Sequence, residues 1–151
     1  MKSLLSAVII AVFTGGAQAQ TLFSPELPMV ILDAAVTDLN EFKWKNRPII
    51  VFADSDDDPA FVEQMERIAA GAEELTERDV VVIVDTDPAA RSDIRLQMRP
   101  RGFMLTFVGK DGNVALRKPF PWSVREITRS IDKMPIRQRE IREQKNVVPR
   151  Q

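Results

Sequence analysis

The sequence predicts an α/β fold with a mixed central sheet, in which a βαβ unit is followed by a β-hairpin and a C-terminal helix. Residues 49–53 and 80–84 are unbroken apolar runs, as is typical of strands that are buried on both faces. Between them, residues 59–76 repeat apolar side chains at helical spacing. A helix that joins two buried strands makes the strands parallel neighbours at the centre of the sheet.

The second half of the chain supplies the hairpin and the terminal helices. Residues 103–108 and 114–117 are β-rich segments, and the Asp-Gly pair at residues 111–112 is a strong signal for a hairpin turn between them. Apolar spacing favours a helix over residues 122–133, and a charged helix or tail follows at residues 136–146.

The remaining segments lie before, between and after these predicted strands and helices. Residues 20–37 are expected to be a linker or an edge segment, residues 38–146 the domain, and residues 147–151 a tail. A short helix is expected to begin at Asp38, since Asp38 and Glu41 have the spacing of a capping box. Another short helix or turn is expected near residues 88–97. This order of elements is the core order of the thioredoxin-like fold.

The N-terminus is typical of a secretory signal peptide. Lys2 precedes an apolar run at residues 4–13, and an Ala-Gln-Ala sequence follows at residues 17–19. The run is about half the length that a membrane span requires. We therefore expect cleavage after Ala19, export to the periplasm or the extracellular space, and no membrane span in the mature chain.

Composition excludes several kinds of chemistry. The 151 residues include no Cys, His or Tyr, so thiol oxidoreductase activity and any imidazole base are excluded.

Charge is unevenly distributed along the chain. Residues 20–90 carry 5 basic and 16 acidic side chains, whereas residues 91–151 carry 15 basic and 6 acidic ones. The net charge of −1, with no aromatic set beside the arginines, argues against nucleic-acid binding. Arg91 and Arg95, one turn apart, are expected on a solvated helix face.

Three stretches carry a resemblance to a known family. They are the Trp-Lys-Asn-Arg sequence at residues 44–47, the Gly-Lys-Asp-Gly turn at 109–112, and residues 131–138. Together they resemble the P-DUDES family, a domain of unknown function that is similar to modules in sushi-repeat extracellular proteins and in small bacterial exported proteins. The resemblance covers roughly residues 38–142. It implies a thioredoxin-like fold without the Cys-x-x-Cys motif, whose place is taken by residues 55–58.

An acidic cluster is the first candidate site. Its six members follow the two apolar strands and are Asp54, Asp56, Asp57, Asp58, Asp85 and Asp87. If the strands are parallel neighbours, these carboxylates meet at the carboxyl ends of the sheet, where open α/β sheets bind ligands. Oxygen ligands of this kind suit Ca²⁺ or Mg²⁺. The alternatives are helix capping with solvation, which Asp favours at helix starts, or a carboxylate pair for acid–base catalysis.

A second set of candidates concerns interaction with a partner. Lys110 lies in the hairpin stretch of the resemblance, and Arg137 and Arg139 lie in the charged C-terminal segment. The competing interpretation is a turn residue and a solvated helix. Trp44 and Trp122 are expected to pack in the core.

The function that the sequence favours is that of an exported, non-enzymatic binding module with no required cofactor, whose ligand is a protein or a small molecule. The alternative is an enzyme or a cation-binding protein that uses the acidic cluster.

Overall fold

The computed structural model describes residues 29–147, so the predicted signal peptide at 1–19 lies outside the described residues. The strands are β1 (Ile31–Asp33), β2 (Arg47–Phe52), β3 (Val80–Asp85), β4 (Met104–Val108) and β5 (Val114–Lys118). The α-helices are α1 (Pro59–Ala70), α2 (Ala72–Thr76), α3 (Asp93–Met98), α4 (Val124–Asp132) and α5 (Pro135–Val147). Short 3₁₀-helices are η1 (Ala34–Val36), η2 (Leu39–Phe42) and η3 (Pro88–Ala90).

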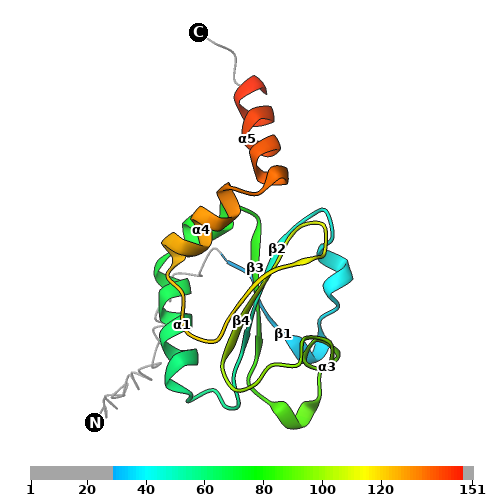
Figure 1. Ribbon diagram of the computed structural model, residues 1–151, viewed down its shortest axis with the longest axis vertical. Coiled ribbons are helices and arrows are strands. Elements are labelled where there is room, and N and C mark those ends of the chain that lie inside the picture. The colour runs from blue at the N-terminus through cyan, green and yellow to red at the C-terminus, as the bar shows by residue number, and fades with distance from the viewer. Residues whose placement is uncertain (1–28, 148–151) are drawn as a thin grey trace, which may run out of the picture.

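The five strands form one mixed sheet in the order β1-β3-β2-β4-β5. Strand β3 pairs in parallel with both β1 and β2, whereas β4 runs antiparallel to β2 and β5 antiparallel to β4 (Figure 1). The predicted fold class is confirmed, because a βαβ unit with a central parallel pair is followed by a hairpin. The edge strand β1 lies within the segment 20–37.

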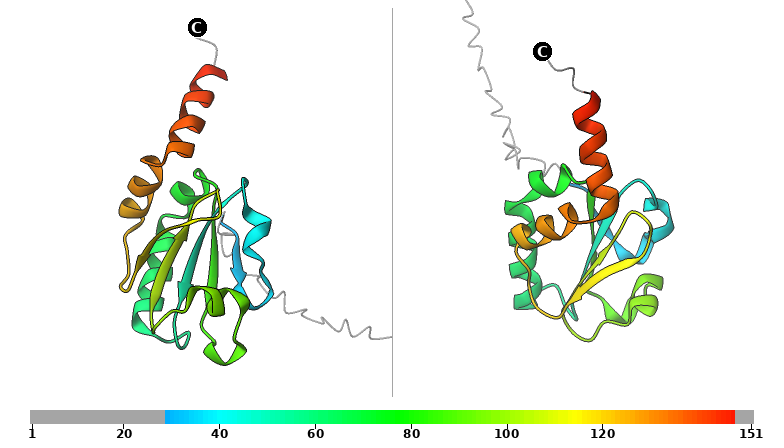
Figure 2. Two further views of the ribbon diagram at one scale, coloured as in Figure 1. Left: turned by 45° about the vertical axis from the view of Figure 1, so that its right-hand side comes forward. Right: turned by 45° about the horizontal axis from the view of Figure 1, so that its top comes forward.

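Side chains alternate across β2 and supply two separate cores. Ile49 and Val51 pack with residues of α1, α2 and α4 on one face of the sheet. Ile50 and Phe52 pack on the other face with Ile94 of α3 and its neighbours. This period-2 alternation is what a strand buried on both faces requires. Figure 2 shows the helices on both sides of the sheet, with α5 projecting beyond it.

The predicted helix over 59–76 is interrupted at Gly71. Asp58 caps α1, since its side chain accepts hydrogen bonds from the backbone N–H groups of Ala60 and Phe61. At Gly71 a β-carbon would lie only 2.6 Å from a methyl group of Val124 on α4. A residue with a side chain would push α4 away, so the close packing of α4 accounts for the glycine at this position.

We expected both tryptophans to pack in the core. Trp122 is partly buried and packs against the core, but the prediction is wrong for Trp44. Trp44 has a φ of 64°, and 69% of its surface is exposed. The short helix at residue 38 is the 3₁₀-helix η2, which ends at Phe42. The chain then turns so that the N–H of Trp44 donates to the carbonyl of Lys110, 2.7 Å away. This contact binds the backbone to the hairpin and leaves the indole outside.

Candidate functional site

The acidic cluster lies at the carboxyl ends of β2 and β3, as the parallel pairing requires. Its members have different roles there. Asp58 caps α1, with its Oδ1 2.8 Å from the N–H of Ala60. Asp87 caps η3 in the same way, 3.0 Å from the N–H of Ala89. Both carboxylates are therefore used by the two helix starts that follow the strands.

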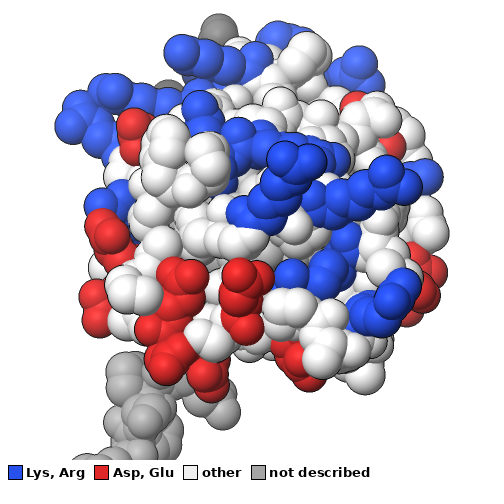
Figure 3. Space-filling model, turned by 60° about the horizontal axis from the view of Figure 1, so that its bottom comes forward, with Lys and Arg blue, Asp and Glu red and all other residues white. Residues whose placement is uncertain are grey.

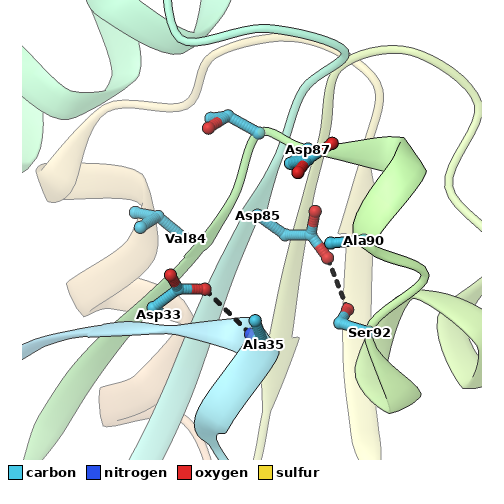
Figure 4. Close-up of a pocket in the computed structure, with 8 residues that line it drawn as sticks. Asp33, Ala35, Val84, Asp85, Asp87, Ala90 and Ser92 are labelled. Atoms are coloured by element: carbon cyan, nitrogen blue, oxygen red, sulfur yellow. Dashed lines mark hydrogen bonds between the residues drawn. The ribbon is translucent and has the colours of Figure 1, made fainter.

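Asp85 is buried and forms an ion pair inside the fold. Its carboxylate accepts a hydrogen bond from Ser92 Oγ at 2.6 Å (Figure 4). It also accepts hydrogen bonds from Arg95 Nε and Nη2 at 2.9 and 2.7 Å. Arg95 also donates to the carbonyl of Ala53, just after β2, at 2.8 Å. The expectation of a solvated face at Arg91 and Arg95 is therefore wrong for Arg95, which joins α3 to the ends of β2 and β3.

The other three acids are exposed. Asp54, Asp56 and Asp57 lie in the loop between β2 and α1, where Ser55 Oγ donates to Asp57. Within residues 29–147, no group of three or more acidic side chains is arranged to hold a metal ion. The cation hypothesis stays a prediction, and helix capping and the Asp85 ion pair account for half of the cluster.

A shallow hollow lies beside Asp85 (Figure 4). It has a volume of about 120 Å³ and is bordered by the ends of β1 and β3 and by η3. Asp33 lines it, but its carboxylate accepts from the N–H of Ala35 at 2.8 Å. Ligand pockets usually measure about 300–1,000 Å³. This hollow is therefore too small for an organic ligand of ordinary size.

At the opposite end of the sheet, a charge network surrounds Arg47. This arginine is 1% exposed and donates to the carbonyl of Arg78 at 2.9 Å and to Glu140 at 3.1 Å. Lys110 Nζ lies 2.7 Å from the carboxylates of both Asp79 and Glu140. Two cations and two carboxylates thus join β2, the start of β3, the hairpin and α5.

The network continues into the junction of α4 and α5. Arg78 donates two hydrogen bonds of 2.9 Å to Asp132, and Arg137 lies 3.5 Å from Asp132 and 3.3 Å from Glu140. The hydrogen bond from Arg78 lowers the pKa of Asp132 despite burial. Burial pushes the pKa of Glu140 upward, but hydrogen bonds from Lys110 and Arg47 outweigh it and lower that pKa. Both carboxylates are therefore held in the charged form.

Beside this network lies a cavity of about 340 Å³ with an almost entirely apolar surface. We call it the hairpin cavity. It is bordered by the start of β2, the β4–β5 hairpin and the junction of α4 and α5. Its lining residues are Arg47, Gly109, Lys110, Asp111, Asn113, Ala115, Met134, Pro135 and Ile136.

The three stretches that carry the family resemblance all contribute to the hairpin cavity. Lys110 and Arg137, which are candidates for interaction, are both engaged in the charge network, whereas Arg139 is exposed on α5. Sequence reasoning missed Arg47 and Glu140 as members of this site. The signal that could have found Arg47 is its place in the first of the three stretches.

Solved structures share the fold. An uncharacterized thioredoxin-like protein from Clostridium perfringens is 15% identical, covers 80% of this chain and 93% of its own, and has a TM-score of 0.56. A reduced 2-Cys peroxiredoxin from Plasmodium vivax is 14% identical, covers 70% of this chain and 85% of its own, and has a TM-score of 0.55. At these identities the likeness concerns the fold alone, and this chain has no Cys.

No helix within residues 29–147 is both long and apolar enough to cross a bilayer.

The family described as "Domain of unknown function (DUF4174)" matches residues 38–140. That range includes β2 to β5, the charge network and every residue that lines the hairpin cavity. The chain therefore belongs to the DUF4174 family and has a thioredoxin-like fold.

Proposed function

We propose that this protein is an exported, non-redox, P-DUDES-type domain that acts as a binding module. The observation that carries the proposal is the hairpin cavity, whose volume of about 340 Å³ falls within the range of ligand pockets. The absence of Cys removes the chemistry of redox-active thioredoxin-like proteins, so binding is the role that the fold can still perform.

The lining of the cavity defines the ligand that it suits. Ala115, Met134 and Ile136 supply apolar surface, whereas the charge of Lys110 is already balanced by Asp79 and Glu140. This combination favours a compact apolar group. Ion pairs fix the walls, since Lys110 and Arg47 both contact Glu140. A preformed cavity of this kind loses little conformational entropy when a ligand binds.

Trp44 adjoins Lys110, one of the residues that line the cavity. Its backbone is hydrogen-bonded to Lys110, and its indole is exposed. Aromatic side chains with large exposed surfaces are frequent anchors at binding sites. A ligand in the cavity that extends toward Lys110 would therefore come near Trp44.

The dye 8-anilinonaphthalene-1-sulfonate tests the cavity, because its aromatic rings are apolar and of suitable size. Dye fluorescence is measured during titration of the wild-type protein, of Ala115→Phe, which fills the cavity, and of Ala89→Phe as a control on exposed η3. We expect Ala115→Phe to weaken binding at least about tenfold, and Ala89→Phe to leave it unchanged. Absence of dye binding, or equal binding by both variants, would contradict the proposal.

Export is tested separately. The apolar run at residues 4–13 and the Ala-Gln-Ala sequence at 17–19 support cleavage before Gln20. N-terminal sequencing of protein recovered outside the cytoplasm should begin at Gln20. Exported protein that retains residues 4–13 would rule out this processing, without bearing on the cavity.

A further inference from the structure

A group of cations at the carboxyl end of the sheet makes no ion pair within residues 29–147. Its members are Arg91, Arg99, Arg101 and Arg117, which we call the basic face. By contrast, Arg47, Arg78, Arg95, Lys110 and Arg137 are all paired with carboxylates. Figure 3 shows Lys and Arg side chains gathered across the middle of this side of the molecule, apart from the main acidic group.

The fold brings these cations together from two segments. Arg117 lies at the end of β5, opposite Thr106 of β4. The next residue, Lys118, points to the other face of the sheet, where its ammonium group lies 4.6 Å from the centre of the Trp122 ring. Arg117 Nη1 donates to the carbonyl of Met98, 2.8 Å away, at the end of α3. The end of β5 therefore adjoins the α3–β4 connection, which carries Arg99 and Arg101.

Two of the arginines occupy an unfavourable backbone conformation. Arg91 has a φ of 48° and Arg99 a φ of 50°, in the left-handed region that glycine and asparagine adopt more readily. Each residue follows a helix, where a glycine would relieve the strain. Such strain is a reason to look for a function of the side chain.

An exposed aromatic side chain follows the end of β5, at the same end of the sheet as the basic face. Phe120 is 54% exposed and lies between Pro119 and Pro121, just after Lys118. The loop is fixed to α1, because Gln64 exchanges hydrogen bonds of 3.0 and 2.7 Å with the backbone of Trp122. A loop held in this way, with two restricted proline backbones, has little freedom to fold Phe120 back onto the protein.

We propose that the basic face and Phe120 dock the protein peripherally onto an anionic lipid surface. Arg and Lys side chains attract anionic headgroups, and an aromatic side chain is favoured at the depth of the headgroups. None of these cations, nor Phe120, lines either cavity described above. Exposed arginines and an exposed aromatic side chain at one end of the sheet suit a flat charged surface better than they suit an enclosed ligand.

The test is sedimentation with vesicles of phosphatidylcholine, with or without an equal share of phosphatidylglycerol, at low and high NaCl. The full chain is compared with Phe120→Ser and with the double variant Arg99→Gln/Arg101→Gln. The matched control, Arg139→Gln/Arg142→Gln, removes the same charge from exposed positions on α5. Since all proteins share one N-terminus, any lipid affinity of residues 4–13 is common to them. Denaturation midpoints establish that each variant is folded.

Wild-type protein should bind the anionic vesicles and be released by salt. We expect Arg99→Gln/Arg101→Gln to weaken binding about fivefold for each charge, and Phe120→Ser about tenfold, with the α5 control close to wild type. The proposal is overturned if binding is absent, if it does not depend on phosphatidylglycerol, or if the α5 variant loses as much. It is also overturned if polyglutamate binds as tightly as the vesicles and Phe120→Ser has no effect on either.

Discussion

The two ends of the central sheet use charge in opposite ways. At the carboxyl end, Asp58, Asp85 and Asp87 each serve a nearby backbone or side-chain partner, and the associated hollow is small. At the other end, Arg47, Lys110 and Glu140 come from segments far apart in the sequence and adjoin a larger apolar cavity. Of these two arrangements, the second borders a space large enough for an ordinary ligand.

This contrast separates a cluster in the sequence from a site in the structure. The acidic residues are conspicuous because they follow one another along the chain, which is what helix starts favour by themselves. The network around Arg47 is spread over residues 47–140 and is assembled only by the sheet and by α5. Long-range pairing makes that end of the molecule dependent on a few buried charges.

The largest effect is expected from Arg47→Ala. This change leaves Glu140 without one of its partners and removes a donor to the Arg78 carbonyl. Because Arg47 is 1% exposed, its removal leaves a cavity and an unpaired carbonyl, so the free energy of unfolding should fall by about 2–4 kcal/mol. It is measured by urea denaturation.

Arg139→Ala is the control for Arg47→Ala, because Arg139 is exposed on α5. We expect this change to alter stability by less than about 0.5 kcal/mol. Equal urea denaturation midpoints for the two variants would show that the charge network around Arg47 does not stabilise this end of the sheet.

A smaller effect should appear as pH dependence. The pKa of Glu140 is lowered from its ordinary value of 4.5. The folded protein therefore binds fewer protons at this site than the unfolded chain does. The resulting stability is complete above about pH 4.5 and is lost as pH falls through the folded-state pKa.

Glu140→Gln removes this contribution, so its stability should fall less steeply than that of wild type as the solution is acidified. The measurement is the denaturation midpoint across the acid range. Glu143→Gln serves as a control, since Glu143 is exposed and makes no ion pair within the described residues. A Glu140→Gln protein with the slope of wild type would exclude Glu140 as a source of the acid dependence.

Local patterns in the sequence account for much of the fold. The apolar runs at 49–53 and 80–84 predicted β2 and β3 as parallel neighbours. A strand that is buried on both faces is apolar at every position, so it is visible in the sequence. The helix break at Gly71 escaped prediction, and the need for a glycine there depends on contact with Val124 from a distant helix. Trp44 was misplaced for a similar reason, because its exposure follows from a backbone bond to the hairpin.

The candidate site was less predictable than the fold. The family stretches indicated Lys110, but nothing local to it revealed Asp79 and Glu140 as its partners. Conversely, the spacing of Asp58 before Pro59 predicted a helix cap, and the structure has that cap. Contacts within one turn of helix are encoded in adjacent residues, whereas ion pairs between distant segments depend on the assembled sheet.

The smallest effects concern the acidic cluster, and they distinguish capping from cation binding. Asp58→Ala should lower stability by about 1 kcal/mol, because it removes the acceptor of the hydrogen bonds at the start of α1. Asp56→Asn and Asp57→Asn should be neutral or slightly stabilising, since both side chains are exposed and near other carboxylates.

A cation site would give a different pattern. A ligand that binds only the folded state raises the melting temperature by mass action, so Ca²⁺ or Mg²⁺ would stabilise the wild type but not the Asp56→Asn/Asp57→Asn variant. Because Asp58, Asp85 and Asp87 already have partners within the fold, we expect millimolar Ca²⁺ to leave the melting temperature of both proteins unchanged. A rise of several degrees that the double variant abolishes would instead establish a cation site at the carboxyl end of the sheet.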